Sequence, residues 1–109
     1  MRIYTKKEFL KLPEGTFFAK GVQWCIDGFC IKGESLENDF YYTNLISIDS
    51  FDSRQLADRQ EEMLEKGTSY PLEESEIRDG MFDDEDIFLA FEKYDLIKIK
   101  EHINKFLGE

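Results

Sequence analysis

The feature that most constrains the fold is an Asp-Gly pair, Asp27-Gly28, which lies between two runs of alternating apolar residues. Such a pair favours a two-residue type I′ turn, because both central positions of that turn need positive φ. We therefore predict a β-hairpin over residues 22–32. The turn would fix the register and place Cys25 opposite Cys30, where oxidation could form a cross-strand disulfide.

Alternation along the two predicted strands divides the hairpin into two faces, because successive side chains point to opposite sides of a strand. We expect the more apolar set to face the core: Val22, Trp24, Ile26, Phe29 and Ile31. The other face would carry Gln23, Cys25, Cys30 and Lys32. Two Cys residues without a CxxC motif or a set of His partners indicate free thiols rather than a redox or zinc site.

Helix and strand signals outside the hairpin indicate an α+β protein. Thr5-Lys6-Lys7-Glu8 matches a capping box, and Asp52 and Gly67 are suitable cap residues for the helix that follows Asp52. We predict helices over residues 6–11, 53–66 and 94–107, and strands over residues 16–19, 40–48 and 87–91. For residues 87–91 a short buried helix is the alternative. The expected fold is one domain, residues 1–109: a small bent antiparallel sheet with about three helices packed around it, the second lying across the sheet.

The formal charge of −10 disfavours direct binding to nucleic acids or anionic membranes, which would repel the chain. The same charge would attract a basic protein surface. No apolar run approaches the length of a membrane span, and the first residues lead into a helix rather than a signal peptide. We therefore expect a cytoplasmic protein.

Eight acidic residues and one Arg lie between Glu73 and Asp86, a local charge of −7. Three interpretations are open: a hard-cation site, a carboxylate surface that mimics nucleic-acid phosphates, or a solvated turn before a buried strand in which Phe82 anchors the loop. The consecutive acids lack the spacing of an EF-hand, so we expect no metal site. The candidate binding residues of this acidic surface are Asp79, Asp83, Asp84, Glu85 and Asp86.

Other chemistry-bearing residues are few. Phe40, Tyr41 and Tyr42 follow one another on a predicted strand, so each face receives at least one ring. We expect these rings to pack in the core, and Tyr41 or Tyr42, if the core does not need it, could stack on a planar ligand or fill a subunit interface. His102 is the only His and is expected on the flank or surface of the last helix, so we expect no catalytic role for it. The chain has no phosphate-binding glycine loop, GxSxG or HExxH motif, and we expect no cofactor.

Three segments carry a resemblance: TKKEFLKLPEGTFF from Thr5, Ile31-Lys32-Gly33 with Asn38-Asp39-Phe40, and RDGMFDDEDIF from Arg78. With them the chain resembles a group of small uncharacterised phage and prophage proteins. The resemblance implies a non-catalytic binding protein that inhibits a host or defence protein or sequesters a small signalling molecule. For an anionic signal, a cluster such as Lys6, Lys7, Lys11 and Lys20 would have to offset the negative charge. The alternatives are a carboxylate- or metal-assisted enzyme centred on the acidic loop and a structural homo-oligomeric component.

Overall fold

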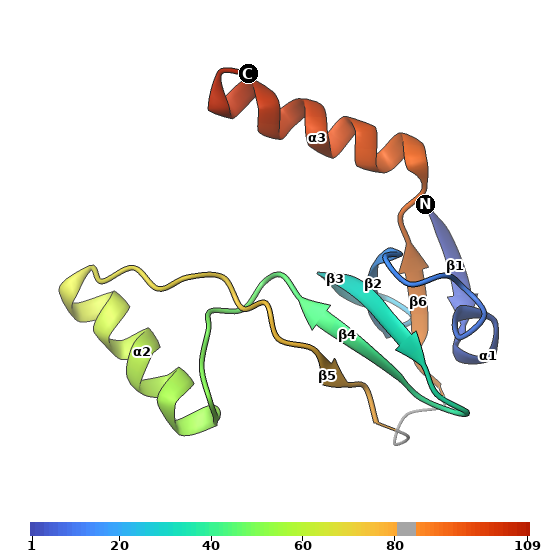
Figure 1. Ribbon diagram of the computed structural model, residues 1–109, viewed down its shortest axis with the longest axis horizontal. Coiled ribbons are helices and arrows are strands. Elements are labelled where there is room, and N and C mark those ends of the chain that lie inside the picture. The colour runs from blue at the N-terminus through green and yellow to red at the C-terminus, as the bar shows by residue number, and fades with distance from the viewer. Residues whose placement is uncertain (81–84) are drawn as a thin grey trace.

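A six-stranded antiparallel sheet forms the centre of the computed structural model, which describes residues 1–80 and 85–109 (Figure 1). In chain order the strands are β1 (Arg2–Thr5), β2 (Phe17–Val22), β3 (Cys25–Ser35), β4 (Phe40–Asn44), β5 (Ile77–Arg78) and β6 (Ile87–Ala90). Their order across the sheet is β1-β6-β2-β3-β4-β5, so the sheet is open, with β1 and β5 at its edges. With three helices in the described residues, the chain is a single small α+β domain.

The hairpin of β2 and β3 turns at a different place from the one predicted. Val22 pairs with Cys25, so the turn is at Gln23 and Trp24, and the predicted turn at Asp27-Gly28 is wrong. Lys20 pairs with Asp27 and Phe18 with Cys30, which leaves one extra residue in β3 and makes a bulge. Gly28 has a φ of 107° at this point, so its conformational freedom serves the bulge instead of the turn.

Four phenylalanines form the core on one face of the sheet. Phe9, Phe18, Phe40 and Phe88 are all 0% exposed. The Phe9 ring stacks on Phe88 with their centroids 4.3 Å apart, and it lies 4.7 Å from the Phe18 ring and 5.1 Å from the Phe40 ring. Phe9 belongs to α1 (Lys6–Phe9), so this four-residue helix closes the core from outside the sheet.

The predicted faces of the hairpin are also wrong. Cys30 and Lys32 are buried on the core side, whereas Val22 and Trp24, which were expected in the core, are exposed. The shifted turn and the bulge change the register, and a shift of one residue exchanges the two faces of a strand. Cys25 is exposed and lies in the same strand as the buried Cys30, so the two are not cross-strand neighbours.

The caps predict where α2 (Ser53–Lys66) begins and ends and where the last helix ends. In α2 the Asp52 carboxylate accepts a hydrogen bond from the Gln55 amide at 2.8 Å, and Gly67 ends the helix with a φ of 68°. The last helix, α3 (Lys93–Leu107), ends at Gly108, which has a φ of 79°. The capping box at α1 is present too, with the Thr5 amide donating to Glu8 at 3.1 Å.

The packing of α2 and α3 differs from the prediction. Within the described residues, neither helix packs on the sheet or on the other helix, and neither contains a buried residue. Figure 1 shows both helices standing away from the sheet. The radius of gyration of 15.7 Å accordingly exceeds the roughly 13 Å expected for a compact chain of this length. No helix of the described part is long and apolar enough to cross a membrane.

Candidate functional site

Asp79, in the middle of the acidic segment of residues 73–86, is held in the fold by ionic contacts. Its side chain is only 4% exposed. Lys20 of β2 donates a hydrogen bond to one carboxylate oxygen, and the Lys6 ammonium lies 3.5 Å from the other. Lys6 also donates to the carbonyl of Gly80 at 2.9 Å. Asp79 was predicted to be part of a solvent-facing acidic surface, and the structure places its carboxylate inside an ion cluster instead.

A second buried carboxylate, Asp39, holds the same turn from the other side. One oxygen accepts from the amides of Phe40 at 2.8 Å and Gly80 at 2.9 Å, and the other accepts from Arg78 at 3.1 Å. Burial acts to raise the pKa of Asp39, but the Phe40 amide, the Arg78 guanidinium and the Gly80 amide outweigh it. The pKa therefore lies below its usual range. Residues 78–80 are thus tied to the beginning of β4.

Lys20 links this ion cluster to the aromatic core. Burial acts to lower the pKa of Lys20, but the hydrogen bond and charge of Asp79 outweigh it, with a further contribution from Asp86, so the pKa is raised. Its ammonium lies 5.0 Å from the centre of the Tyr42 ring. In the described residues no buried side-chain polar atom lacks a hydrogen-bond partner. The ion cluster of Lys6, Lys20, Asp39, Arg78 and Asp79 is therefore satisfied internally, and we assign it a structural role.

The remaining acidic candidates lie after the turn. Asp83 and Asp84 lie outside the described residues, as does Phe82. Glu85 is exposed, and Asp86 is half-buried, with its charge acting on Lys20. Among the described residues there is no group of three or more His, Cys, Asp or Glu side chains that could hold a metal ion.

The two candidate tyrosines are on β4. Tyr42 packs against the aromatic core, 6.0 Å from the Phe18 ring and 5.9 Å from the Phe40 ring, and burial is the largest cause that raises its pKa. Tyr41 pairs with Arg78 of β5 and is half-buried. The structure therefore brings Tyr42 together with Asp79 through Lys20, but as part of the core.

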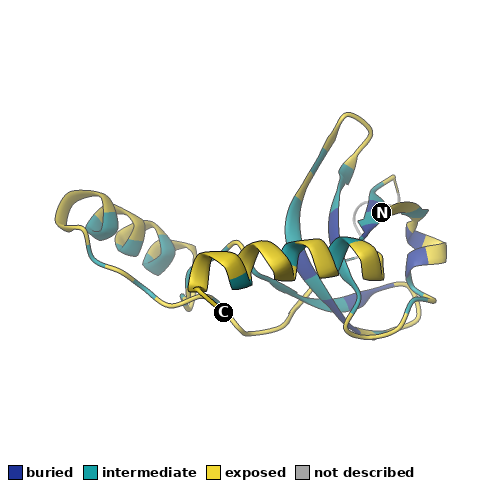
Figure 2. Ribbon diagram, turned by 90° about the horizontal axis from the view of Figure 1, so that it is seen from above, coloured by how far each residue is buried: buried dark blue, intermediate teal, exposed yellow. Residues whose placement is uncertain are grey.

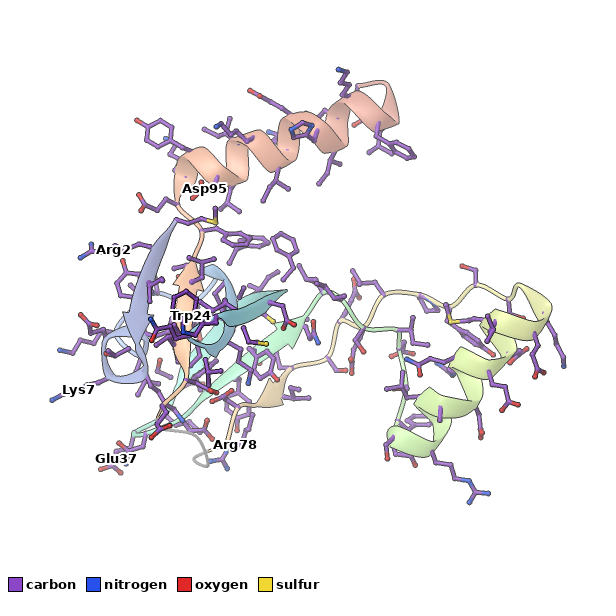
Figure 3. All side chains as sticks on the ribbon, turned by 180° about the vertical axis from the view of Figure 1, so that it is seen from behind. Arg2, Lys7, Trp24, Glu37, Arg78 and Asp95 are labelled. Carbon is purple, nitrogen blue, oxygen red and sulfur yellow. The ribbon has the colours of Figure 1, made fainter. Side chains whose placement is uncertain are left out.

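A groove of about 830 Å³ separates the region of α1 from the loop after β3. Lys7 and Lys11 line it on one side, and Glu37 and Asn38 on the other. Figure 3 shows Lys7 pointing outward from the body and Glu37 at its lower edge. Lys6 also lines the groove, but its ammonium is bound to Gly80 and Asp79. The four lysines of the predicted cation cluster are thus divided between this groove and the ion cluster.

The tip of the β2–β3 hairpin presents the most exposed large apolar side chain among the described residues. Trp24 is 93% exposed, and its neighbour Val22 is 48% exposed. The hairpin projects from the body with an exposed end (Figure 2), and Figure 3 shows Trp24 in front of the sheet. Trp24 has a φ of 76°, a left-handed conformation that Gly or Asn normally supplies at the second residue of a turn.

Two acidic residues lie just before β6, at the same end of the sheet as this hairpin tip. Ile87, the first residue of β6, pairs with Gly21, which directly precedes Val22 and the turn. Glu85 and Asp86 come immediately before Ile87. The tip therefore combines an exposed aromatic ring with carboxylates near its base. Sequence reasoning placed Trp24 in the core, and nothing in the alternating pattern distinguishes an apolar residue in a strand from one at a turn.

No protein-family model, no curated protein and no solved structure matches the chain.

Proposed function

We propose that this chain is a non-catalytic binding protein that contacts another protein through the tip of its β2–β3 hairpin, with Trp24 as the anchor. The observation that carries the proposal is that the only Trp of the chain is 93% exposed at a turn where its φ is 76°. Trp buries a large area when it enters a pocket and is among the side chains most enriched at the energetic centres of interfaces.

Two features make the position of Trp24 informative. A left-handed conformation costs a non-glycine residue about 1–2 kcal/mol, so Trp at this turn lowers the stability of the fold relative to Gly. The ring also brings no packing to the fold, because almost all of its surface is exposed. Trp24 lowers the stability of the fold and makes no internal contact that would compensate. Its presence at this turn is better explained by a contact with another molecule.

The charge near the hairpin indicates the character of the partner. Glu85 and Asp86 precede the strand beside the hairpin, and the whole chain carries −10. We infer a partner with an apolar pocket for Trp24 next to a basic surface. The resemblance to phage and prophage proteins supports a host or defence protein as that partner, in the cytoplasm of the host.

Site-specific photo-crosslinking in host cells tests this proposal. A photoreactive residue at Gln23 should give an adduct with one defined protein, and the same residue at Lys7, which lines the groove beside α1, should not. Unlabelled wild-type protein should compete for the adduct, whereas Trp24→Ala should not. Identical adducts from both probe positions, or equal competition by the Ala variant, would show that the hairpin tip is not the binding surface.

A second candidate function is the sequestration of a small anionic molecule in the groove beside α1. Its volume of about 830 Å³ lies within the roughly 300–1,000 Å³ of ligand sites. Lys7 and Lys11 would supply the cationic contacts and Asn38 a polar contact, with Glu37 opposing them. Isothermal titration with mononucleotides and cyclic dinucleotides tests this function. Binding that is lost in Lys7→Ala/Lys11→Ala supports it, and no heat with any of these ligands contradicts it.

A further inference from the structure

Helices α2 and α3 both expose large apolar side chains. Phe51, next to the start of α2, is 91% exposed, and Leu64 near its end is 87% exposed. In α3, Phe106 is 90% exposed and Ile103 is 51% exposed. Neither helix packs on another helix or strand of the described residues. Most helices of this length owe their stability to the packing of an apolar face, so both faces need a cover.

The topology keeps the two helices apart within one chain. α3 follows β6, next to one edge of the sheet, whereas α2 connects β4 to β5 at the other edge. Four strand spacings separate β6 from β5, which amounts to roughly 19 Å at the usual 4.8 Å per strand. Near the start of α3, the Met1 ammonium lies 2.7 Å from the Asp95 carboxylate, so this end of the helix contacts the beginning of the chain beside β1.

The two helices have opposite charges. Residues 52–66 contain five acidic and three basic residues, a net charge of −2. In contrast, α3 contains four lysines against Asp95 and Glu101, a net charge of +2 in a chain that carries −10 overall. The apolar face of α2 is therefore suited to packing on a helix like α3, and the apolar face of α3 on a helix like α2.

We propose that two copies of the chain associate by packing α3 of each copy antiparallel on α2 of the other. A twofold axis would repeat this helix pair, so a single complementary contact is made twice. Figure 1 shows α2 and α3 extending to the same side of the molecule, where one second copy can meet both. This assembly uses neither Trp24 nor the groove, and it is independent of the proposed binding function.

The antiparallel direction follows from the positions of the residues along each helix. Phe51 lies just before the N-cap of α2 and Phe106 near the end of α3, so antiparallel packing places these two exposed rings at the same end of the helix pair. Glu61 lies beside the exposed Leu64 on α2, and Lys100 lies beside Ile103 on α3. In an antiparallel pair these flanks lie on the same side of the contact. Counted from the two rings, Glu61 and Lys100 of the other copy are ten and six residues away, an offset of roughly 6 Å along the axis at 1.5 Å per residue, which two long side chains can span.

Charge reversal tests this assembly in the full chain by analytical ultracentrifugation. The wild type should be a dimer whose association weakens as salt rises. Lys100→Glu and Glu61→Lys should each raise the dimer dissociation constant roughly tenfold, because each places like charges together at two equivalent sites. An equimolar mixture of the two variants should recover dimers, since their heterodimer has opposite charges at both sites. No intramolecular pairing can give this recovery.

The matched control is Lys98→Glu, which makes the same charge change roughly 120° away from the apolar stripe of α3. It should leave the dissociation constant unchanged, and circular dichroism should show all variants folded. A monomeric wild type, or two variants that stay dimeric, would overturn the proposal. So would a mixture that stays monomeric. A monomer whose Ile103 position photo-crosslinks to a different protein would also overturn it and would assign the α3 face to that protein.

Discussion

Lys20 donates a hydrogen bond to the carboxylate of Asp79 across 59 positions of sequence, and the Asp79 side chain is 4% exposed. This pair joins the middle of the acidic segment to β2, a strand inside the sheet. We predict that Asp79→Asn lowers the free energy of unfolding by about 2–3 kcal/mol, because two lysines lose the carboxylate that compensates their burial. Urea denaturation measures the change.

The control for Asp79 is Glu85→Gln, which removes an acidic charge from an exposed residue a few positions later. It should change the free energy of unfolding by less than about 0.5 kcal/mol. Equal effects of the two substitutions would mean that the ion cluster contributes no more than general charge repulsion does.

The lowered pKa of Asp39 leads us to predict that the folded chain loses stability in acid. Its pKa is lower in the folded chain than the roughly 3.9 of an unfolded one, so its contribution is complete above about pH 5. The contribution is lost as the pH falls through the folded pKa, because protonation removes the charge that Arg78 pairs with. Urea denaturation from pH 7 to pH 3 should show the gap between wild type and Asp39→Asn closing in acid. A gap that stays constant would contradict this assignment.

Several helix caps could be predicted from the sequence because they depend on local chemistry. Asp52 with Gln55, Thr5 with Glu8, and Gly67 act within a few residues of each other. The buried run at residues 87–91 likewise forms β6, a strand inside the sheet. By contrast, β1 was missed, because its four residues form a strand only by pairing with β6 at the far end of the chain.

The hairpin and the ion cluster show why the rest of the fold and of the site could not be predicted. A Gly with positive φ suits a turn and a bulge equally, so Gly28 alone could not decide between them. The register then decided which face of β3 is buried, and with it the positions of Trp24 and Lys32. In the sequence, Asp79 is one of eight acidic residues between residues 73 and 86 and nothing local distinguishes it. Only the tertiary fold does so, because it brings Lys6 and Lys20 next to its carboxylate.

Lys32 is a lysine buried against the core, and removing its charge should stabilise the chain. It is 2% exposed, donates to the Gly33 carbonyl and the Ser35 hydroxyl, and has no ion pair with any described residue. Burial lowers its pKa. We predict that Lys32→Met raises the free energy of unfolding at pH 7 by about 1 kcal/mol, since a Met of similar length avoids the cost of burying an ammonium.

The pH dependence of the Lys32→Met effect provides the check. The pKa of Lys32 in the folded chain is below the unfolded value of about 10.4. Between these two pH values the unfolded chain holds more protons than the folded chain, so the wild type gains stability as the pH rises. The advantage of the Met variant should therefore shrink as the pH approaches 10.4. A Met variant that is less stable than wild type at every pH would mean that the hydrogen bonds of Lys32 outweigh its burial.

We predict that replacing Trp24 by Gly raises the stability of the fold and weakens binding to the partner. Gly accepts the φ of 76° without steric cost, so Trp24→Gly should raise the free energy of unfolding by about 0.5–1 kcal/mol while removing the proposed anchor. Trp24→Ala removes the same ring but keeps a side chain in the left-handed conformation, so it should lose binding without that gain in stability. Urea denaturation measures the first effect, and the crosslinking competition at Gln23 measures the second. A Gly variant less stable than the Ala variant would show that the turn does not strain Trp24, and the argument for an external role would then rest on its exposure alone.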